Sequence, residues 1–169
     1  MSQVLALWHR ASSLPLVGGT VGKRAFSFAF SQKAPYFSTI RARFVELRPG
    51  YVELVIPKRR AVHNHIGTVH AIALCNGLEA AMGALAEATI PDDKRWIPQG
   101  MEVTYTAKAT SDITCIAETT PEQWTGDDPE VAVRVRGVRE DGTVVIEGVI
   151  RLHVTPKKKP APVVVPQAR

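Results

Sequence analysis

The sequence predicts an α+β fold in which an antiparallel sheet wraps around one long central helix. Residues 72–88 are apolar on nearly every side of the helix that they would form, which is the pattern of a buried helix. Segments that alternate apolar and polar residues lie on both sides of this stretch. A sheet that curls around such a helix covers one side of it, so we expect a partner to cover the other.

The alternating segments predict strands joined partly by hairpins. Turn residues mark two of the connections, Arg48-Pro49-Gly50 and Asp141-Gly142. The segments are residues 40–47, 51–56, 101–107, 113–117, 131–139 and 144–154. The predicted order is therefore two strands, the long helix and four antiparallel strands.

The start of the long helix follows a polar loop, residues 57–67. We expect Thr68 to cap its N-terminus, because a threonine hydroxyl accepts hydrogen bonds from the free N–H groups of a first turn. The helix would run to about Ala88 and end at Ile90-Pro91, since proline cannot continue it.

Two terminal segments flank the domain, which we place at residues 35–155. Residues 1–34 are expected to form a helical extension, and a group of aromatic residues in and after it is expected to pack against the domain: Phe26, Phe28, Phe30, Tyr36 and Phe37. Residues 156–169 are rich in lysine and proline and are expected to be a disordered tail.

The composition narrows the function classes. The chain has 169 residues, 45% of them hydrophobic, which is enough for one domain with its own core. The net charge of +5 lies mostly at the ends, since residues 1–45 hold six Lys or Arg and no Asp or Glu. The sequence has no basic stripe with interleaved aromatic residues, so it does not indicate nucleic-acid binding. It has no run of about 20 apolar residues either, so no membrane span is predicted.

The cellular location is predicted from the cysteines and the N-terminus. Cys75 and Cys115 lie in apolar segments and are expected to be buried thiols in a reducing compartment. We therefore expect a cytoplasmic protein. The alternative is a mitochondrial one, because an acid-free N-terminus with arginine and serine is typical of a transit peptide.

The segment that carries the chemistry runs from Asn64 to Ala71, directly into the helix. The free backbone N–H groups at a helix N-terminus can hold a carbonyl or an oxyanion. A carboxylate, Glu79, follows inside the apolar stretch and is expected to be buried. This combination is a layout for acyl transfer.

The spacing of four residues is typical of a known family. Gly67 comes three residues after Asn64, His70 three residues after Gly67, and Glu79 nine residues after His70. With them the chain resembles the hotdog-fold acyl-CoA thioesterase superfamily, in its phenylacetate-pathway (PaaI-like) branch. Three further motifs are similar to a hotdog subgroup known only as a domain of unknown function: Ala34-Pro35-Tyr36-Phe37, Arg48-Pro49-Gly50-Tyr51 and Arg95-Trp96-Ile97-Pro98. The resemblance implies hydrolysis of an acyl-CoA thioester, with coenzyme A as part of the substrate and no separate cofactor.

Helix geometry predicts that the site needs two chains. Nine residues turn an α-helix through about 900°, so His70 and Glu79 would lie on opposite sides and roughly 13 Å apart along the axis. In a two-fold dimer, Glu79 of one copy can meet the loop from Asn64 to Ala71 of the other. The resemblance implies the same arrangement, as a homodimer or a homotetramer.

Each candidate residue has an expected role. The N–H of Ala71 would bind the thioester carbonyl, and Glu79 would activate water or attack directly. Asn64 would position water or the thioester, His70 would order the loop, and Gly67 would shape it. The residues expected beside the substrate are Lys58, Arg59 and Arg60, near the coenzyme A phosphates, together with His65 and Trp96.

Other interpretations stay open at this point. Glu79 could instead bond to Asn76 at a dimer interface, and Asn64 and Gly67 could be turn residues alone. The branch usually has two glycines where Ala71-Ile72 stand, aspartate in place of Glu79, and a serine or threonine in place of Pro98. These departures favour a protein that binds acyl ligands without catalysis.

Two further alternatives use the histidines. His65 and Glu79 have the separation of the acid and base in hotdog dehydratases, which would make the protein an enoyl-acyl hydratase or dehydratase. His63, His65, His70, Cys75 and Glu79 lie close together in the sequence, but their spacing does not match a helical zinc motif. No metal site is expected.

Overall fold

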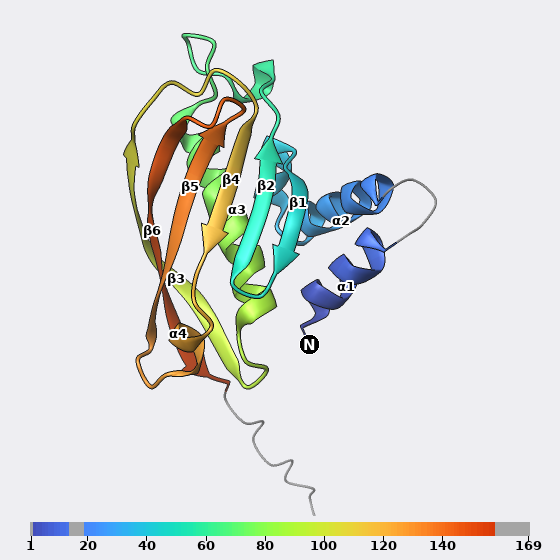
Figure 1. The fold of residues 1–169 in the computed structure, drawn as a ribbon, viewed down its shortest axis with the longest axis vertical. Coiled ribbons are helices and arrows are strands. Elements are labelled where there is room, and N and C mark those ends of the chain that lie inside the picture. Colours follow the sequence, from blue (N-terminus) through green and yellow to red (C-terminus); the bar gives the residue numbers. More distant parts are fainter. Residues whose placement is uncertain (1, 14–18, 158–169) are drawn as a thin grey trace, which may run out of the picture.

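A six-stranded antiparallel sheet curves around the long helix α3 (Figure 1). The computed structural model describes residues 2–13 and 19–157. The helices are α1 (Gln3–Ser12), α2 (Thr20–Lys33), α3 (Ala71–Thr89) and α4 (Glu122–Thr125), with short 3₁₀ helices η2 (Pro35–Ile40) and η3 (Arg60–Val62). The strands are β1 (Arg43–Arg48), β2 (Tyr51–Ile56), β3 (Lys94–Tyr105), β4 (Ile113–Glu118), β5 (Glu130–Arg139) and β6 (Val144–Pro156).

The sheet has the strand order β1-β2-β4-β5-β6-β3, which leaves β1 and β3 at its edges. Both predicted hairpins are present, as β1–β2 and β5–β6, and Gly142 has the positive φ of 85° that its tight turn requires. Apolar and polar residues alternate along β4 because only one face of the strand is buried. Ile113, Cys115 and Ala117 on that face are fully buried against α3. The predicted α+β architecture is confirmed.

Helix α3 forms the centre of the core. It runs from Ala71 to Thr89, and Leu78 and Leu85 on it are completely buried. The cap is His70 rather than Thr68: the imidazole Nδ1 of His70 accepts a hydrogen bond from the N–H of Ile72 at 3.1 Å. Of the described helices, α3 alone is long and apolar enough to cross a membrane, but the sheet encloses most of it as a core helix.

Helix α3 approaches the sheet closely at Gly77. A Cβ atom on this residue would lie 2.3 Å from Ile56 Cδ1 and 2.8 Å from Cys115 Sγ. We expect Gly77→Ala to lower the free energy of unfolding by about 1–3 kcal/mol, because the buried side chains of Ile56 and Cys115, or α3 itself, must shift. Urea unfolding followed by circular dichroism measures this.

The control for Gly77→Ala is Gly100→Ala, in β3. A Cβ at Gly100 would meet nothing within 4 Å. Its free energy of unfolding should therefore stay within about 0.5 kcal/mol of the wild-type value. An equal loss in both variants would contradict the close approach as the cause.

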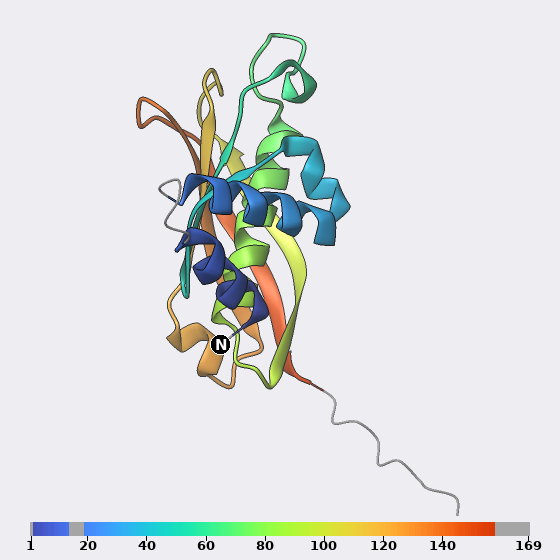
Figure 2. The ribbon, with the colours of Figure 1, turned by 90° about the vertical axis from the view of Figure 1, so that its right-hand side faces the viewer.

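Helices α1 and α2 pack at the β1 edge and cross in front of α3 when the molecule is viewed from that side (Figure 2). An aromatic cluster joins them to the sheet: the ring of Phe26 lies 5.1 Å from those of Trp8 and Phe44. The hydroxyl of Ser27 accepts a hydrogen bond from the N–H of Phe44 at 2.9 Å. The N-terminal segment is thus folded onto the domain.

The prediction that all five aromatic residues pack is wrong for two of them. Phe26 is buried and Phe30 and Phe37 are half-buried, but Phe28 is 67% exposed and Tyr36 is 65% exposed. Phe26 and Phe30 are four residues apart and share one face of α2, whereas Phe28 points to the opposite face. Aromatic residues at a spacing of two cannot all face the core of a helix.

Strand β6 continues through Pro156, the first residue of the predicted tail. Lys157 is bonded as well, since its N–H donates to the carbonyl of Asp93 at 2.7 Å. The prediction of disorder therefore does not hold for these two residues. The rest of the tail, residues 158–169, lies outside the described residues.

Candidate functional site

The loop before α3 is closed by the side chain of Asn64. Its Oδ1 accepts hydrogen bonds from the N–H groups of Ile66 and Thr68, both at 3.1 Å, and its Nδ2 donates to the hydroxyl of Thr68 at 2.8 Å. Gly67 has a φ of 77°, which only glycine adopts without strain. This geometry supports the role of Asn64 and Gly67 as residues that shape the loop.

The same contacts explain why Thr68 is not the cap. Its hydroxyl is engaged by Asn64, so His70 supplies the acceptor for the first turn. A neutral imidazole whose Nδ1 accepts carries its proton on Nε2. The His70 ring is thereby fixed at the start of α3, and the N–H of Ala71 belongs to the group that a helix start leaves without an intrahelical partner.

A polar cavity of about 200 Å³ lies between this helix start and η2. His70 and Ala73 line it from α3 and its cap, and His63 lines it from the loop. Asn76, only 5% exposed, reaches it from the next turn, and its Nδ2 donates to the hydroxyl of Thr39 at 3.1 Å.

Two buried polar atoms of this cavity have no hydrogen-bond partner among the described residues. They are His63 Nε2 and Asn76 Oδ1. Buried polar atoms are nearly always satisfied in proteins, so the cavity is suited to a polar group, with a donor for Asn76 Oδ1. The roles of His63 and Asn76 were missed from the sequence, although an asparagine within an apolar helix was an available signal.

Glu79 lines a second cavity, of about 260 Å³ and largely apolar. Phe30 and Phe37 line it from α2 and η2, and Met82 and Trp96 line it from α3 and β3. Glu79 is exposed in the single chain, so the prediction that it is buried is wrong. The apolar residues that precede and follow it in sequence lie on other faces of α3, and among residues 2–13 and 19–157 no segment buries the side chain of Glu79.

Glu79 has no hydrogen bond or ion pair within the part of the chain that the structure describes, and Asn76 bonds to Thr39 instead. The predicted alternative of an Asn76–Glu79 bond is therefore wrong. The far end of the cavity is fixed by Trp96, whose indole N–H donates to Glu87 at 3.1 Å. Pro98 lines the cavity too, without a side-chain donor for Glu79.

The two cavities follow one face of α3. Asn76, Glu79, Gly83 and Glu87 are spaced by three and four residues, which places them on one side of a helix. His70 lines the polar cavity and Glu79 the apolar one. Eight residues separate Ala71 from Glu79, about 12 Å along the axis, so one carbonyl cannot contact both within one chain.

The predicted phosphate-binding residues surround η3. Lys58 and Arg60 have exposed side chains, and His65 is exposed in the loop. Arg59 is half-buried and donates through Nη2 to the carbonyl of Thr39. Burial, and then the like charge of Arg41, lower the pKa of Arg59.

The two cysteines differ in their surroundings. Cys115 is fully buried, and burial raises the pKa of its thiol, as expected for a core residue. Cys75 is only half-buried and lies 3.4 Å from the hydroxyl of Tyr105 on β3, so the prediction that both thiols are buried is wrong for Cys75. Within residues 2–13 and 19–157, no three side chains of His, Cys, Asp or Glu gather in a group that could hold a metal ion.

Comparison with known proteins identifies the family to which the chain belongs. Residues 22–154 match the family described as Domain of unknown function (DUF4442). The chain belongs to this family. It is 47% identical to a protein solved as the structural-genomics target APC5556, with a TM-score of 0.75 over 81% of this chain and 92% of that one. No functionally curated protein matches the chain.

More distant structures share the fold. A Pseudomonas aeruginosa protein of unknown function, PA5026, described as a probable thioesterase, is 24% identical, with a TM-score of 0.70 over 78% of this chain and 93% of that one. A thioesterase family protein from Silicibacter pomeroyi is 20% identical, with a TM-score of 0.64 over 78% of this chain and 96% of that one. The DUF4442 protein thus has the hotdog fold, and the resemblance to hotdog proteins is confirmed.

Proposed function

We propose that this DUF4442 protein hydrolyses acyl-CoA thioesters at a site shared by two copies of the chain. The observation that carries the proposal is the position of Glu79, an unpaired carboxylate among the described residues, at the edge of an apolar cavity. About 260 Å³ is below the range of pockets that hold a whole drug-sized ligand, and it suits an acyl group alone. The thioesterase descriptions of structures with the same fold agree with this reaction.

The free edge of the sheet supports the two-copy site. Strand β3 is twelve residues long and lies at the edge, and its Ile97 and Tyr105 are 61% and 52% exposed. A long edge strand leaves a row of free backbone N–H and C=O groups with which a second strand can pair. A two-fold axis at β3 would also bring a second copy toward the uncovered face of Glu79.

The proposed reaction uses the helix start of one copy and the acid of the other. The N–H of Ala71 binds the thioester oxygen, and the partial positive charge of the helix N-terminus stabilises the developing oxyanion. Water attacks the carbonyl carbon while Glu79 accepts its proton. The C–S bond then breaks, and that proton passes to the leaving thiolate, giving a carboxylic acid and free coenzyme A.

The polar cavity supports the placement of the coenzyme. The pantetheine arm of coenzyme A carries amide N–H and C=O groups, which could bond to Asn76 Oδ1 and to His63 Nε2, the two atoms without a partner among the described residues. Lys58, Arg59 and Arg60 lie next to this cavity and would meet the phosphates. His70 would hold the loop in place rather than react.

The test is thiol release from acyl-CoAs of short, long and aryl acyl groups, together with calorimetric binding of the same compounds. We expect hydrolysis to be fastest for groups that fill the apolar cavity. Saturable binding without thiol release would instead show the non-catalytic acyl-ligand binder. Hydration of an enoyl-CoA would favour the reaction of His65 and Glu79, whose side chains the described structure does not join.

A further inference from the structure

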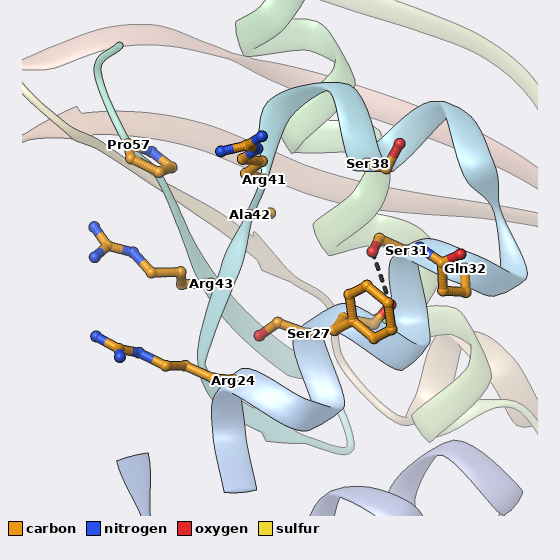
Figure 3. Close-up of a pocket in the computed structure, with 10 residues that line it drawn as sticks. Arg24, Ser27, Ser31, Gln32, Ser38, Arg41, Ala42, Arg43 and Pro57 are labelled. Carbon is orange, nitrogen blue, oxygen red and sulfur yellow. Dashed lines mark hydrogen bonds between the residues drawn. The ribbon is translucent and has the colours of Figure 1, made fainter. Parts of the chain in front are cut away.

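A groove of about 690 Å³ opens between α2 and β1, apart from both cavities of the proposed thioesterase site (Figure 3). Three arginines from three segments line it: Arg24 on α2, Arg41 after η2 and Arg43 at the start of β1. In Figure 3, the side chains of Arg24 and Arg43 extend from the ribbon in the same direction. We call this the arginine groove.

The positive charge of the arginine groove is only partly compensated. Arg43 pairs with Asp112 at 2.9 Å. Arg24 and Arg41 have no acidic partner within residues 2–13 and 19–157, and residues 1–45 of the sequence contain no Asp or Glu. Three of the six basic residues in this N-terminal segment therefore line one groove.

The backbone of Arg41 has an unfavourable conformation. Its φ of 48° and ψ of 45° lie in the left-handed region, and it is the one non-glycine residue with positive φ in the described part of the chain. The other four such positions there are all glycines. Residues in such conformations cluster at functional sites, so this position at the C-cap of η2 supports a role for the Arg41 side chain.

Neutral polar groups of the arginine groove could bind phosphate oxygens alongside the arginines. The hydroxyl of Ser38 and the amide of Gln32 line it and have no hydrogen bond among the described residues. The ring of Phe28, 67% exposed, adds an apolar surface. Guanidinium groups bind phosphate oxygens in pairs, with shorter and stronger hydrogen bonds than neutral donors make.

We propose that the arginine groove binds a phosphate-bearing ligand with at least two negative charges, held by Arg24 and Arg41. The phosphate has two possible sources, a soluble phosphorylated metabolite or the headgroup of an anionic phospholipid. Phe28 offers contact to either. The site shares no lining residue with the cavities at Glu79 and at His70, so it does not depend on the proposed hydrolysis.

The test compares two double variants of the full chain. Arg24→Gln with Arg41→Gln removes two charges from the arginine groove, and Lys108→Gln with Arg134→Gln removes two exposed charges elsewhere. Calorimetry with inorganic pyrophosphate probes the soluble source. Sedimentation with phosphatidylcholine vesicles, with and without phosphatidic acid, probes the lipid source. Circular dichroism and thermal unfolding check that both variants fold.

We expect pyrophosphate to bind wild type at one site per chain and to bind the groove variant about tenfold more weakly or worse, because each lost charge-assisted hydrogen bond costs at least that factor. The control should change the dissociation constant by less than about twofold. Binding to phosphatidic acid vesicles that follows the same pattern assigns the lipid source, and its absence assigns the soluble one. Equal losses in both variants, or no binding to either probe, would overturn the proposal.

Discussion

Replacing Ala71 with proline will lower kcat for thioester hydrolysis by about 100-fold or more and leave the fold intact. Proline removes the backbone N–H that we expect to hold the carbonyl oxygen, and loss of one such donor costs about 100- to 1000-fold in rate. Ala71 is the first residue of α3, a position where proline is favoured. His70, with φ −65° and ψ 140°, already has a conformation that a residue before proline adopts.

The matched control is Ala71→Gly. It retains the N–H and removes only the methyl group, so activity should remain near the wild-type value or rise as the ligand approaches the backbone more closely. Steady-state thiol release and thermal unfolding are measured for both variants. If Ala71→Pro kept its full rate while folded, the helix start would have no part in binding the carbonyl.

The second large effect is expected from Glu79→Gln. Glutamine has the same shape but cannot accept the proton of water, and loss of a general base typically costs about 100- to 10,000-fold in kcat. Because Glu79 is exposed and makes no hydrogen bond with the described residues, the change should leave stability near that of the wild type. Thiol release at saturating substrate measures the effect.

Glu87→Gln is the comparison for this variant. Glu87 lines the same cavity, and a glutamine oxygen can still accept the hydrogen bond of the Trp96 indole. Its effect on kcat should be far smaller than that of Glu79→Gln. Equal rates for the wild type and Glu79→Gln would remove Glu79 from the mechanism.

The architecture was predictable because its signals are local. The apolar run of α3, the turn at Asp141-Gly142 and the alternation of β4 each fix one element, and antiparallel pairing follows from short connections. The spacing of Asn64, Gly67 and His70 likewise located the loop that forms the start of α3.

The remaining features depend on tertiary contacts. The sequence favours Thr68 as the cap, but Asn64 engages the hydroxyl of Thr68 in the folded chain, and His70 caps the helix instead. Glu79 has apolar neighbours in sequence, but its exposure depends on which faces of α3 the sheet and η2 cover. The groove formed by Arg24 and Arg41 joins segments that only the fold brings together.

The central claim is that Ala71 of one copy and Glu79 of another form one site, and a heterodimer tests it directly. One subunit carries Ala71→Pro and the other Glu79→Gln, and different affinity tags isolate the mixed dimer. If the site is shared, one of its two sites is intact and the other has both changes, so we predict about half of the wild-type rate per dimer. A mixed dimer as inactive as each variant alone would contradict a shared site.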